Sequence, residues 1–236
     1  MKNKILAIAF MLLPLMGYAE VQYGSEQYSL GMNIGYAHNR TYGSYANIDL
    51  GAFMPINKNF EMEAALRYQT AGNMFMGLQL RPKFAVPVGE FYLSNHLQAR
   101  VFARDKVNEA ILDLGVGYRM DYVLVQLGMS TRLIIPQPYN WHGNDQIICE
   151  PFNLTYRVQA WVRPQESVWN IWFAVSNYDN YQIERVWVPM FYIGGEYKID
   201  AHWQVNLQAS CKPAGMFHLD ASYYGADVRA GFNYRF

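Results

Sequence analysis

The feature that most constrains this chain is an alternation of apolar and polar side chains with a period of two residues, repeated along most of its length. In "YSLGMNIGY", residues 28–36, tyrosine and large aliphatic residues take every second position, and serine, glycine and asparagine take the positions between. Successive side chains of a β-strand point to opposite faces of a sheet, whereas an α-helix repeats every 3.6 residues. The pattern therefore predicts two-faced strands, and no helix is expected beyond residue 19.

Twelve segments of this kind follow one another up to the last residue. Short turns separate every second pair of segments. The other connections are short at first and longer later, near residues 134–151, 178–188 and 212–222. Strands joined in this order pair antiparallel as an up-and-down meander. We therefore predict an all-β fold, an antiparallel up-and-down transmembrane barrel of twelve strands, with ten as the alternative count.

The N-terminus has the three parts of a secretory signal peptide. Lys2 and Lys4 form a basic start, an apolar run follows to Met16, and small residues precede a cleavage point after Ala19. The apolar run is too short for a transmembrane helix, and no second run of about 20 apolar residues follows. We therefore expect residues 1–19 to be a signal peptide and residues 20–236 to form one barrel domain.

Composition excludes several classes of function. Formal net charge is zero and no basic patch stands out, so no nucleic-acid partner is expected. Two cysteines are too few for a disulfide framework in a chain of this size. No metal-ligand spacing and no phosphate-binding loop is present, so we expect neither a metal nor another cofactor.

The alternation alone does not say which face points outward, because the apolar face of a lipocalin-like soluble barrel points inward. A twelve-stranded barrel is too wide for apolar side chains on every strand to fill it evenly. Glycines lie mainly on the polar face, as Gly31, Gly115 and Gly231 do, where they leave room for charged side chains. Tyr28 and Tyr36 bracket an apolar stripe of roughly 20 Å, close to the apolar band of an outer-membrane barrel. These features favour an apolar exterior facing lipid.

The last strand, "DVRAGFNYRF", ends on alternating aromatic residues and a terminal phenylalanine. With the signal peptide and the two-residue repeat, this segment makes the chain resemble the bacterial outer-membrane β-barrel proteins. The resemblance implies that Phe232, Tyr234 and Phe236 are the signal for the barrel-assembly machinery. It also implies a place in the outer membrane of a Gram-negative bacterium, among its lipid and lipopolysaccharide. An even number of strands would then put both termini on the periplasmic side.

The polar face carries charges of both signs that would line the barrel interior. They could set the selectivity of a small porin-like channel for a polar solute, or they could pack as a salt-bridged network in a structural or binding barrel. The candidate residues are Asp49, Glu61, Glu63, Arg67, Arg81, Arg100, Asp113, Arg119, Arg132, Arg157, Glu196 and Arg229.

The expected long loops hold the remaining candidates. Tyr139, Trp141, His142 and Trp187 could contact a ligand outside the cell. A lipid-modifying hydrolase, of the phospholipase or lipid A deacylase type, is the alternative function. It needs a nucleophile beside a histidine base, and no serine lies next to His142 in the sequence. No catalytic residue is therefore assigned, and the protein is not expected to be an enzyme.

Overall fold

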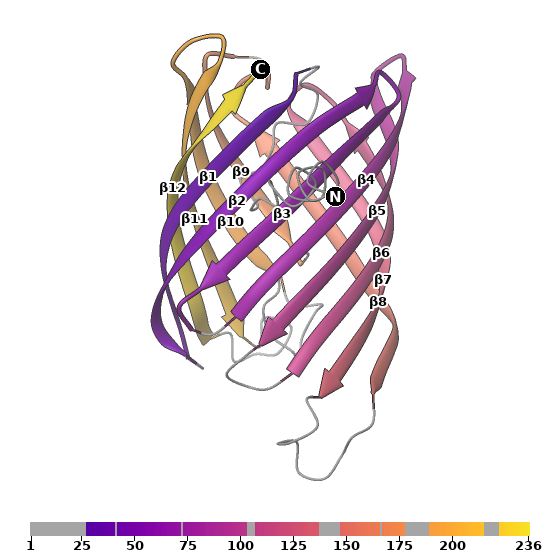
Figure 1. Cartoon of the computed structure of the whole chain (residues 1–236). Coiled ribbons are helices and arrows are strands. Elements are labelled where there is room, and N and C mark those ends of the chain that lie inside the picture. Colours follow the sequence, from indigo (N-terminus) through magenta and orange to yellow (C-terminus); the bar gives the residue numbers. More distant parts are fainter. Residues whose placement is uncertain are drawn as a thin grey trace, which may run out of the picture.

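The computed structural model describes residues 27–40, 42–71, 73–102, 107–136, 147–165, 167–177, 189–214 and 222–236. Residues 1–19, expected to be a signal peptide, lie outside this part. The described chain forms antiparallel strands paired in sequence order, and the last strand pairs with the first to close a barrel (Figure 1). The predicted barrel of twelve strands is confirmed. The strands are β1 (Ser29–Asn39), β2 (Gly43–Asn57), β3 (Phe60–Gln69), β4 (Asn73–Val86), β5 (Gly89–Phe102), β6 (Val107–Arg119), β7 (Val123–Pro136), β8 (Ile148–Trp161), β9 (Trp169–Ser176), β10 (Met190–Lys198), β11 (Trp203–Ala214) and β12 (Ser222–Arg235).

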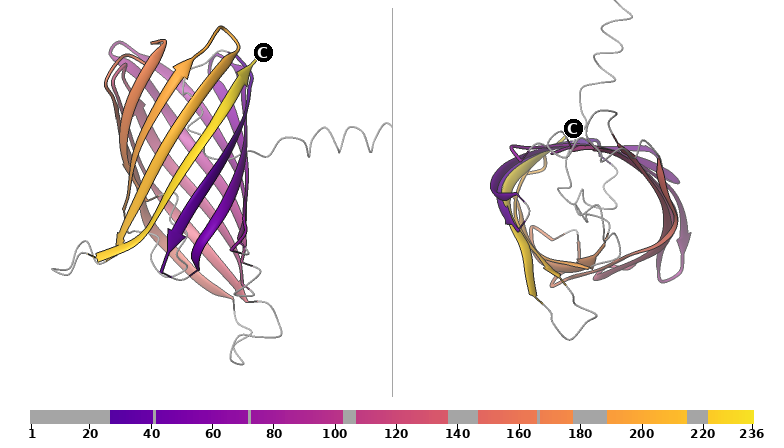
Figure 2. Two further views of the ribbon diagram at one scale, coloured as in Figure 1. Left: turned by 90° about the vertical axis from the view of Figure 1, so that its left-hand side faces the viewer. Right: turned by 90° about the horizontal axis from the view of Figure 1, so that it is seen from below.

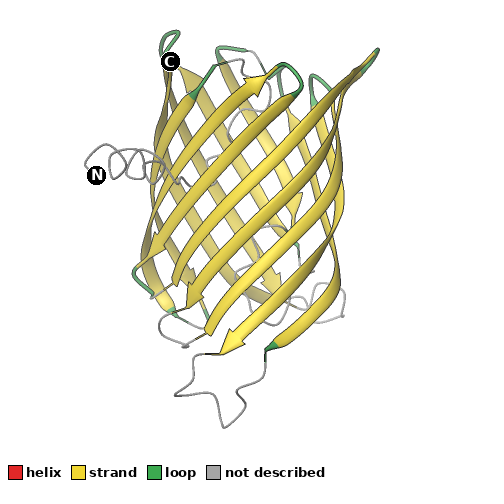
Figure 3. Ribbon diagram, turned by 45° about the vertical axis from the view of Figure 1, so that its right-hand side comes forward, coloured by secondary structure: helices red, strands yellow, loops and turns green. Residues whose placement is uncertain are grey.

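The barrel has two unlike ends. One end, here called the turn end, holds the start of β1, the end of β12 and tight connections such as the one from β6 to β7. There the Met120 N–H donates to the Val123 carbonyl at 2.8 Å. Figures 1 and 3 show the C-terminus at this end. The opposite end, here called the loop end, carries the connections from β1 to β2, from β7 to β8 and from β11 to β12.

Two connections at the loop end are shorter than the sequence pattern predicted. β7 continues to Pro136 and β8 begins at Ile148, so strand replaces both ends of the loop expected over residues 134–151. The ladder pairs Ile134 with Ile148 and Leu133 with Cys149, and β-branched residues fit such a paired surface. β11 likewise runs on to Ala214. Strand pairing thus extends beyond the apolar band, where alternation in the sequence fades.

Along most of the strands, alternate residues differ sharply in exposure. In β7, Leu127 and Met129 are more than half exposed, whereas Gln126 and Ser130 are buried. Because the sheet closes into a ring, seen along its axis in Figure 2, the exposed residues lie on the outer wall and the buried residues face inward. The outer wall is predominantly apolar. No helix within the described residues is long and apolar enough to cross a membrane.

The C-terminal strand is not an open edge. β1 and β12 pair from Ser29 with Arg235 to Asn39 with Gly225, and the two strands lie side by side in Figure 2. Such closure removes the hazard of an unpaired sheet edge. At the turn end the Phe236 N–H donates to the carbonyl of Tyr28 at 2.9 Å.

Two prolines within strands lie at irregularities of the ladder. The register of β2 shifts after Pro55, and that of β11 shifts between Lys212 and Pro213. Proline lacks an N–H group and is confined to bulges or edges in a sheet. A bulge also changes the direction in which nearby side chains point. This matters at Lys212, which lines a pocket described below.

Candidate functional site

The twelve charged residues selected from the sequence all belong to the inward-facing set of their strands. Arg119 and Glu196 are partly exposed near the turn end. The other ten are buried, each with at most 7% of its surface exposed: Asp49, Glu61, Glu63, Arg67, Arg81, Arg100, Asp113, Arg132, Arg157 and Arg229. Burial of so many charges is costly unless each is paired or hydrogen-bonded.

A first group of ion pairs joins β2, β3 and β4. Arg67 Nε lies 2.5 Å from Asp49 Oδ1 on the neighbouring strand. Arg81 Nε lies 3.0 Å from Glu61 Oε1, and Arg81 Nη2 forms a second ion pair with Glu63. Each guanidinium therefore links two adjacent strands across the inner face. Charge-assisted contacts of this kind are stronger than neutral hydrogen bonds.

A second group runs in series across β5, β6, β7 and β8. The Glu109 carboxylate lies between Arg100 Nη1, at 3.5 Å, and Arg132 Nε, with which it forms a close ion pair. Arg132 Nη1 then lies 3.1 Å from Glu150 Oε2. Acidic and basic groups alternate along the series, so neighbouring charges offset one another.

Further polar contacts extend across β6 to β8. Thr155 Oγ1 donates to Asp113 Oδ2 at 2.5 Å, although the whole of β7 lies between their strands. Gly128 of β7 permits this contact, because a Cβ atom there would lie 2.8 Å from Thr155 Oγ1. Arg157 donates from Nε and Nη2 to Gln159 Oε1, at 3.1 and 2.8 Å.

The two partly exposed candidates take part in contacts near the turn end. Arg119 Nη1 lies 3.6 Å from Glu90 Oε2. Gln204 donates from Nε2 to Glu196 Oε2 at 2.8 Å, and its Oε1 accepts from Arg235 Nη2 at 2.6 Å. The polar lining thus reaches the turn end on β5, β6, β10, β11 and β12.

Where the barrel closes, side chains of β2 and β12 reach each other over β1. Arg229 Nη1 donates to Asp49 Oδ2 at 2.8 Å, and Asn47 Nδ2 donates to Asp227 Oδ2 at 2.6 Å. Gly35 of β1 lies beneath this crossing. A Cβ atom at Gly35 would lie 2.3 Å from Asn47 Oδ1 and 2.6 Å from Arg229 Cγ. The absent side chain makes room for a bridge that joins the first and last parts of the barrel.

An apolar stretch of the inner face on β5 to β10, here called the apolar track, was missed by the sequence reasoning. Trp161 connects two buried clusters, because it packs against both of them. One cluster is Tyr92 and Leu124, and the other is Trp172, Ala174, Met190 and Tyr192. A Cβ atom at Gly117 or Gly194 would overlap the facing ring of Tyr92 or Trp172. One sequence signal could have revealed the track. It is an aromatic residue at a position that alternates with the apolar ones, paired across the ladder with a glycine. The track comprises Tyr92, Leu124, Trp161, Trp172, Ala174, Met190 and Tyr192.

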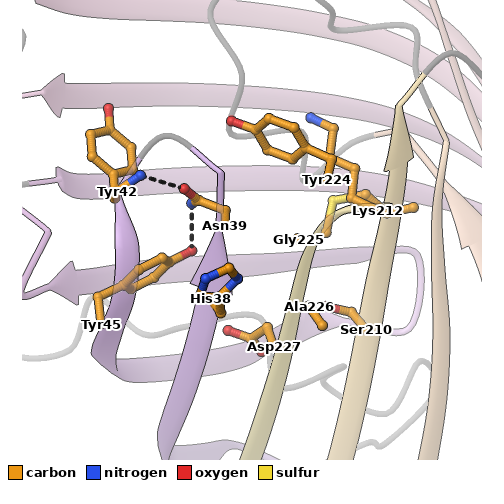
Figure 4. Close-up of a pocket in the computed structure, with 11 residues that line it drawn as sticks. His38, Asn39, Tyr42, Tyr45, Ser210, Lys212, Tyr224, Gly225, Ala226 and Asp227 are labelled. Atoms are coloured by element: carbon orange, nitrogen blue, oxygen red, sulfur yellow. Dashed lines mark hydrogen bonds between the residues drawn. The ribbon is translucent and has the colours of Figure 1, made fainter. Parts of the chain in front are cut away.

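A pocket opens at the loop end, between the β1–β2 hairpin and β10 to β12, and is here called the mouth pocket (Figure 4). Asn39 Nδ2 donates to the Tyr45 hydroxyl at 3.3 Å, and the Tyr42 N–H donates to Asn39 Oδ1 at 2.7 Å. Across the pocket, Figure 4 shows Lys212 beside Tyr224. Its polar lining is His38, Asn39, Tyr42, Tyr45, Ser210, Lys212, Tyr224 and Asp227.

On the outer wall, the three aromatic residues proposed as an assembly signal lie together at the turn end. The ring centroids of Tyr234 and Phe236 are 5.1 Å apart, and those of Tyr234 and Trp203 are 4.9 Å apart. Phe232 lies 5.7 Å from Trp203 by the same measure. Tyr and Trp prefer membrane interfaces, where a ring can meet both lipid and water.

The loop candidates Tyr139, Trp141, His142 and Trp187 lie outside the described residues. Of the described histidines, His96 is buried on the inner face with Gln98 Nε2 3.1 Å from its Nε2. Among the described residues there is no group of three or more His, Cys, Asp or Glu side chains that could hold a metal ion.

The fold is that of outer-membrane β-barrels. The KdgM porin, solved in complex with disordered oligogalacturonate, superposes with a TM-score of 0.53 at 11% identity, over 88% of this chain and 99% of that chain. The NanC porin superposes with a TM-score of 0.54 at 7% identity, over 88% of this chain and 100% of that chain. The translocator domain of the autotransporter NalP from Neisseria meningitidis superposes with a TM-score of 0.53 at 12% identity, over 100% of this chain and 96% of that chain.

No family model matches the sequence, and no curated protein matches it. The likeness to solved structures shows the fold alone, which is that of an outer-membrane barrel. Porins and an autotransporter translocator share that fold, so function has to be argued from the barrel interior.

Proposed function

We propose that this protein resides in the outer membrane of a Gram-negative bacterium and forms a narrow channel for small polar solutes. The loop end faces the exterior, and the turn end, where β1 begins and β12 ends, faces the periplasm. The observation that carries the proposal is the contrast between the two faces of one closed sheet. Its outer wall is predominantly apolar, and its inner wall, apart from the apolar track, is lined with amide side chains and with charged side chains of both signs. A hydrophilic path inside an apolar wall is what passage of a polar solute through lipid requires.

The likeness to two porins supports this proposal, and one of them has been solved in complex with an oligogalacturonate. The inner ion pairs suggest a channel with weak charge preference. Glu109 lies between the guanidinium groups of Arg100 and Arg132, whereas Arg81 lies between two carboxylates. Because neighbouring charges offset one another, neither anions nor cations are strongly favoured along the lumen.

Planar-bilayer recording of the purified full-length protein tests the channel. We expect discrete conductance steps, and we expect Arg132→Gln and Glu109→Gln to shift the reversal potential in a salt gradient in opposite directions. The outer-wall variant Leu112→Val on β6 serves as the matched control and leaves it unchanged. Each variant is first checked for heat-dependent mobility on gels, because a lone buried charge destabilises a barrel. Repeated silence of folded protein at high load would refute the channel.

A structural barrel with a closed interior is a second candidate. The specific observation in its favour is the nearly complete burial of inner charges such as Arg81 and Arg132, which have no exposed surface. Folded but silent protein would support this candidate. A lipid hydrolase is the alternative from another class, and acyl release from labelled phospholipid or lipopolysaccharide, abolished by His142→Ala, would establish it instead.

A further inference from the structure

A polar side chain, that of Asn95 on β5, lies in the middle of the apolar outer wall. We propose that Asn95, together with the groove beside it, is the contact at which two copies of this barrel form a twofold dimer within the membrane. The inference rests on the proposed function for the membrane location alone, because a dimer can form whether or not the barrel conducts.

Asn95 is surrounded by leucine residues at mid-height of the wall. It is the seventh of the fourteen residues of β5 and is exposed, as are Leu93 and Leu97 on either side of it. Across the ladders it is paired with Leu80 of β4 and Leu114 of β6. In the part of the chain that the structure describes, no hydrogen bond reaches its side chain. The hydrocarbon core of a membrane holds no water, and an amide there is costly without a partner.

The backbone beside Asn95 is also irregular. The ladder between β4 and β5 skips two residues of each strand directly after the pair of Leu80 and Asn95. One of the skipped residues is Pro82, which has no N–H group to donate. Irregular backbone within the hydrocarbon region of a membrane is normally covered by protein. A covering protein at this place would therefore satisfy two separate features, the lone amide and the interrupted ladder.

An open groove of about 750 Å³ crosses the same part of the wall, here called the outer groove. It lies over β5 to β8, which form the right-hand wall in Figure 1, and Pro82 lies at one end of it. Gly115 and Gly128 are paired with each other and line it between two rows of outward side chains. One row is Leu93, Val116 and Leu127, and the other is Asn95, Leu114, Met129 and Leu154. A row of side chains on a second barrel can therefore enter between these two rows.

The chemistry of the amide selects a second copy as the partner. Lipid acyl chains have neither a hydrogen-bond donor nor an acceptor, whereas an amide side chain has both. Two barrels inserted in the same direction are related by an axis along the membrane normal, so residues of equal depth meet in a twofold contact. Asn95 of one copy can then donate to and accept from Asn95 of the other. Polar side chains join transmembrane segments in the same way.

Disulfide trapping in phospholipid vesicles tests the position of the contact. The full chain carries Cys149→Ser and Cys211→Ser, and one new cysteine is placed on the outer wall. We expect Asn95→Cys to give a dimer of folded barrels on unheated gels when an oxidant is added. Leu207→Cys is the matched control, because Leu207 is 57% exposed on β11, on the opposite side of the ring. It should give no dimer.

Sedimentation equilibrium in density-matched detergent tests the role of the amide. Asn95→Leu extends the leucine surface and removes the amide, and it should raise the dissociation constant of the dimer by about tenfold or more. Asn95→Gln keeps an amide and should dimerise within about threefold of the wild type. Leu207→Ala changes the opposite wall and should leave the dissociation constant unchanged. Heat-dependent mobility on gels first shows that each variant is folded.

Two results would overturn the proposal. One is a folded Asn95→Cys barrel that gives no more dimer than Leu207→Cys. The other is equal dimer affinity of the wild type and folded Asn95→Leu. A trapped dimer that conducts no current would refute the channel alone, and a conducting barrel that remains monomeric would refute the dimer alone.

Discussion

The bridge over β1 makes Gly35→Ala an informative perturbation of barrel stability. A Cβ atom at Gly35 would lie 2.3 Å from Asn47 Oδ1 and 2.6 Å from Arg229 Cγ. Carbon atoms pack best at about 3.5–4.0 Å from their neighbours. Both side chains must therefore move by roughly 1 Å, and each holds one bond of the bridge, from Arg229 to Asp49 and from Asn47 to Asp227.

The expected cost follows from those two bonds. Hydrogen bonds to charged groups contribute about 1.5–3 kcal/mol each, so loss of both would cost about 3–6 kcal/mol. Replacement of glycine by alanine within a strand returns up to about 1 kcal/mol, because the unfolded chain loses flexibility. We therefore expect Gly35→Ala to lower the free energy of unfolding by about 2–5 kcal/mol.

Gly195→Ala on β10 is the matched control. A Cβ atom at Gly195 would meet only a backbone oxygen of Asn170, at 3.9 Å. It should leave stability unchanged or raise it by about 0.5–1 kcal/mol. Urea unfolding in phospholipid vesicles, followed by tryptophan fluorescence and by heat-dependent mobility on gels, measures both variants. If the two variants unfold within about 0.5 kcal/mol of each other, the bridge does not contribute to closure of the barrel.

Three further predictions concern the outer wall, one turn and the C-terminus. Leu114 is 57% exposed on the outer wall. Leu114→Arg should therefore destabilise the inserted barrel by roughly 2–4 kcal/mol. Val88→Arg in the exposed β4–β5 turn should stay within about 0.5 kcal/mol of the wild type in the same urea unfolding assay; similar losses would show that the face assignment is wrong. Two backbone N–H groups donate to Asp200 in the β10–β11 turn, at 2.7 Å each, and hold the pKa of its carboxyl below 3.8. That stabilisation is present above the ordinary pKa and is lost as pH falls through the lowered value, so a carboxyl titration midpoint at or above 3.8 by nuclear magnetic resonance would contradict the capped turn. Deletion of Phe236 should reduce the amount of barrel in outer-membrane fractions, because the aromatic end of β12 is the proposed assembly signal. Phe152→Ala, on the outer wall near the loop end, should leave that amount unchanged, and equal losses would argue against a C-terminal signal.

Much of the architecture could be read from the chain alone. A period of two residues is a local property, since each strand residue points opposite to its neighbours whatever the rest of the fold does. The closing strand was predictable for the same reason, because a two-faced strand that ends the chain needs a partner for its edge. Strand ends were less predictable. Pairing beyond the apolar band, as at Pro136 and Ala214, depends on the ladder and not on alternation.

The inner face illustrates what alternation cannot resolve. Parity placed Asp49, Arg67 and Arg229 on the same face, but it could not show that one carboxylate lies between two guanidinium groups. Trp161 and Trp172 share the inward parity with polar residues, and their packing depends on which strands are neighbours and on the glycines opposite them.

The sequence by itself therefore determined the type of element and the two faces of the sheet, because these follow from a pattern between adjacent residues, and it favoured twelve strands over ten. Only the tertiary structure decided which charges pair, where Gly35 lets β12 reach β2, and how Lys212 comes to line a pocket with Asn39. Those contacts join residues up to 180 positions apart in the chain. They depend on the register of every ladder between them, since a shift of one residue would turn each side chain to the other face.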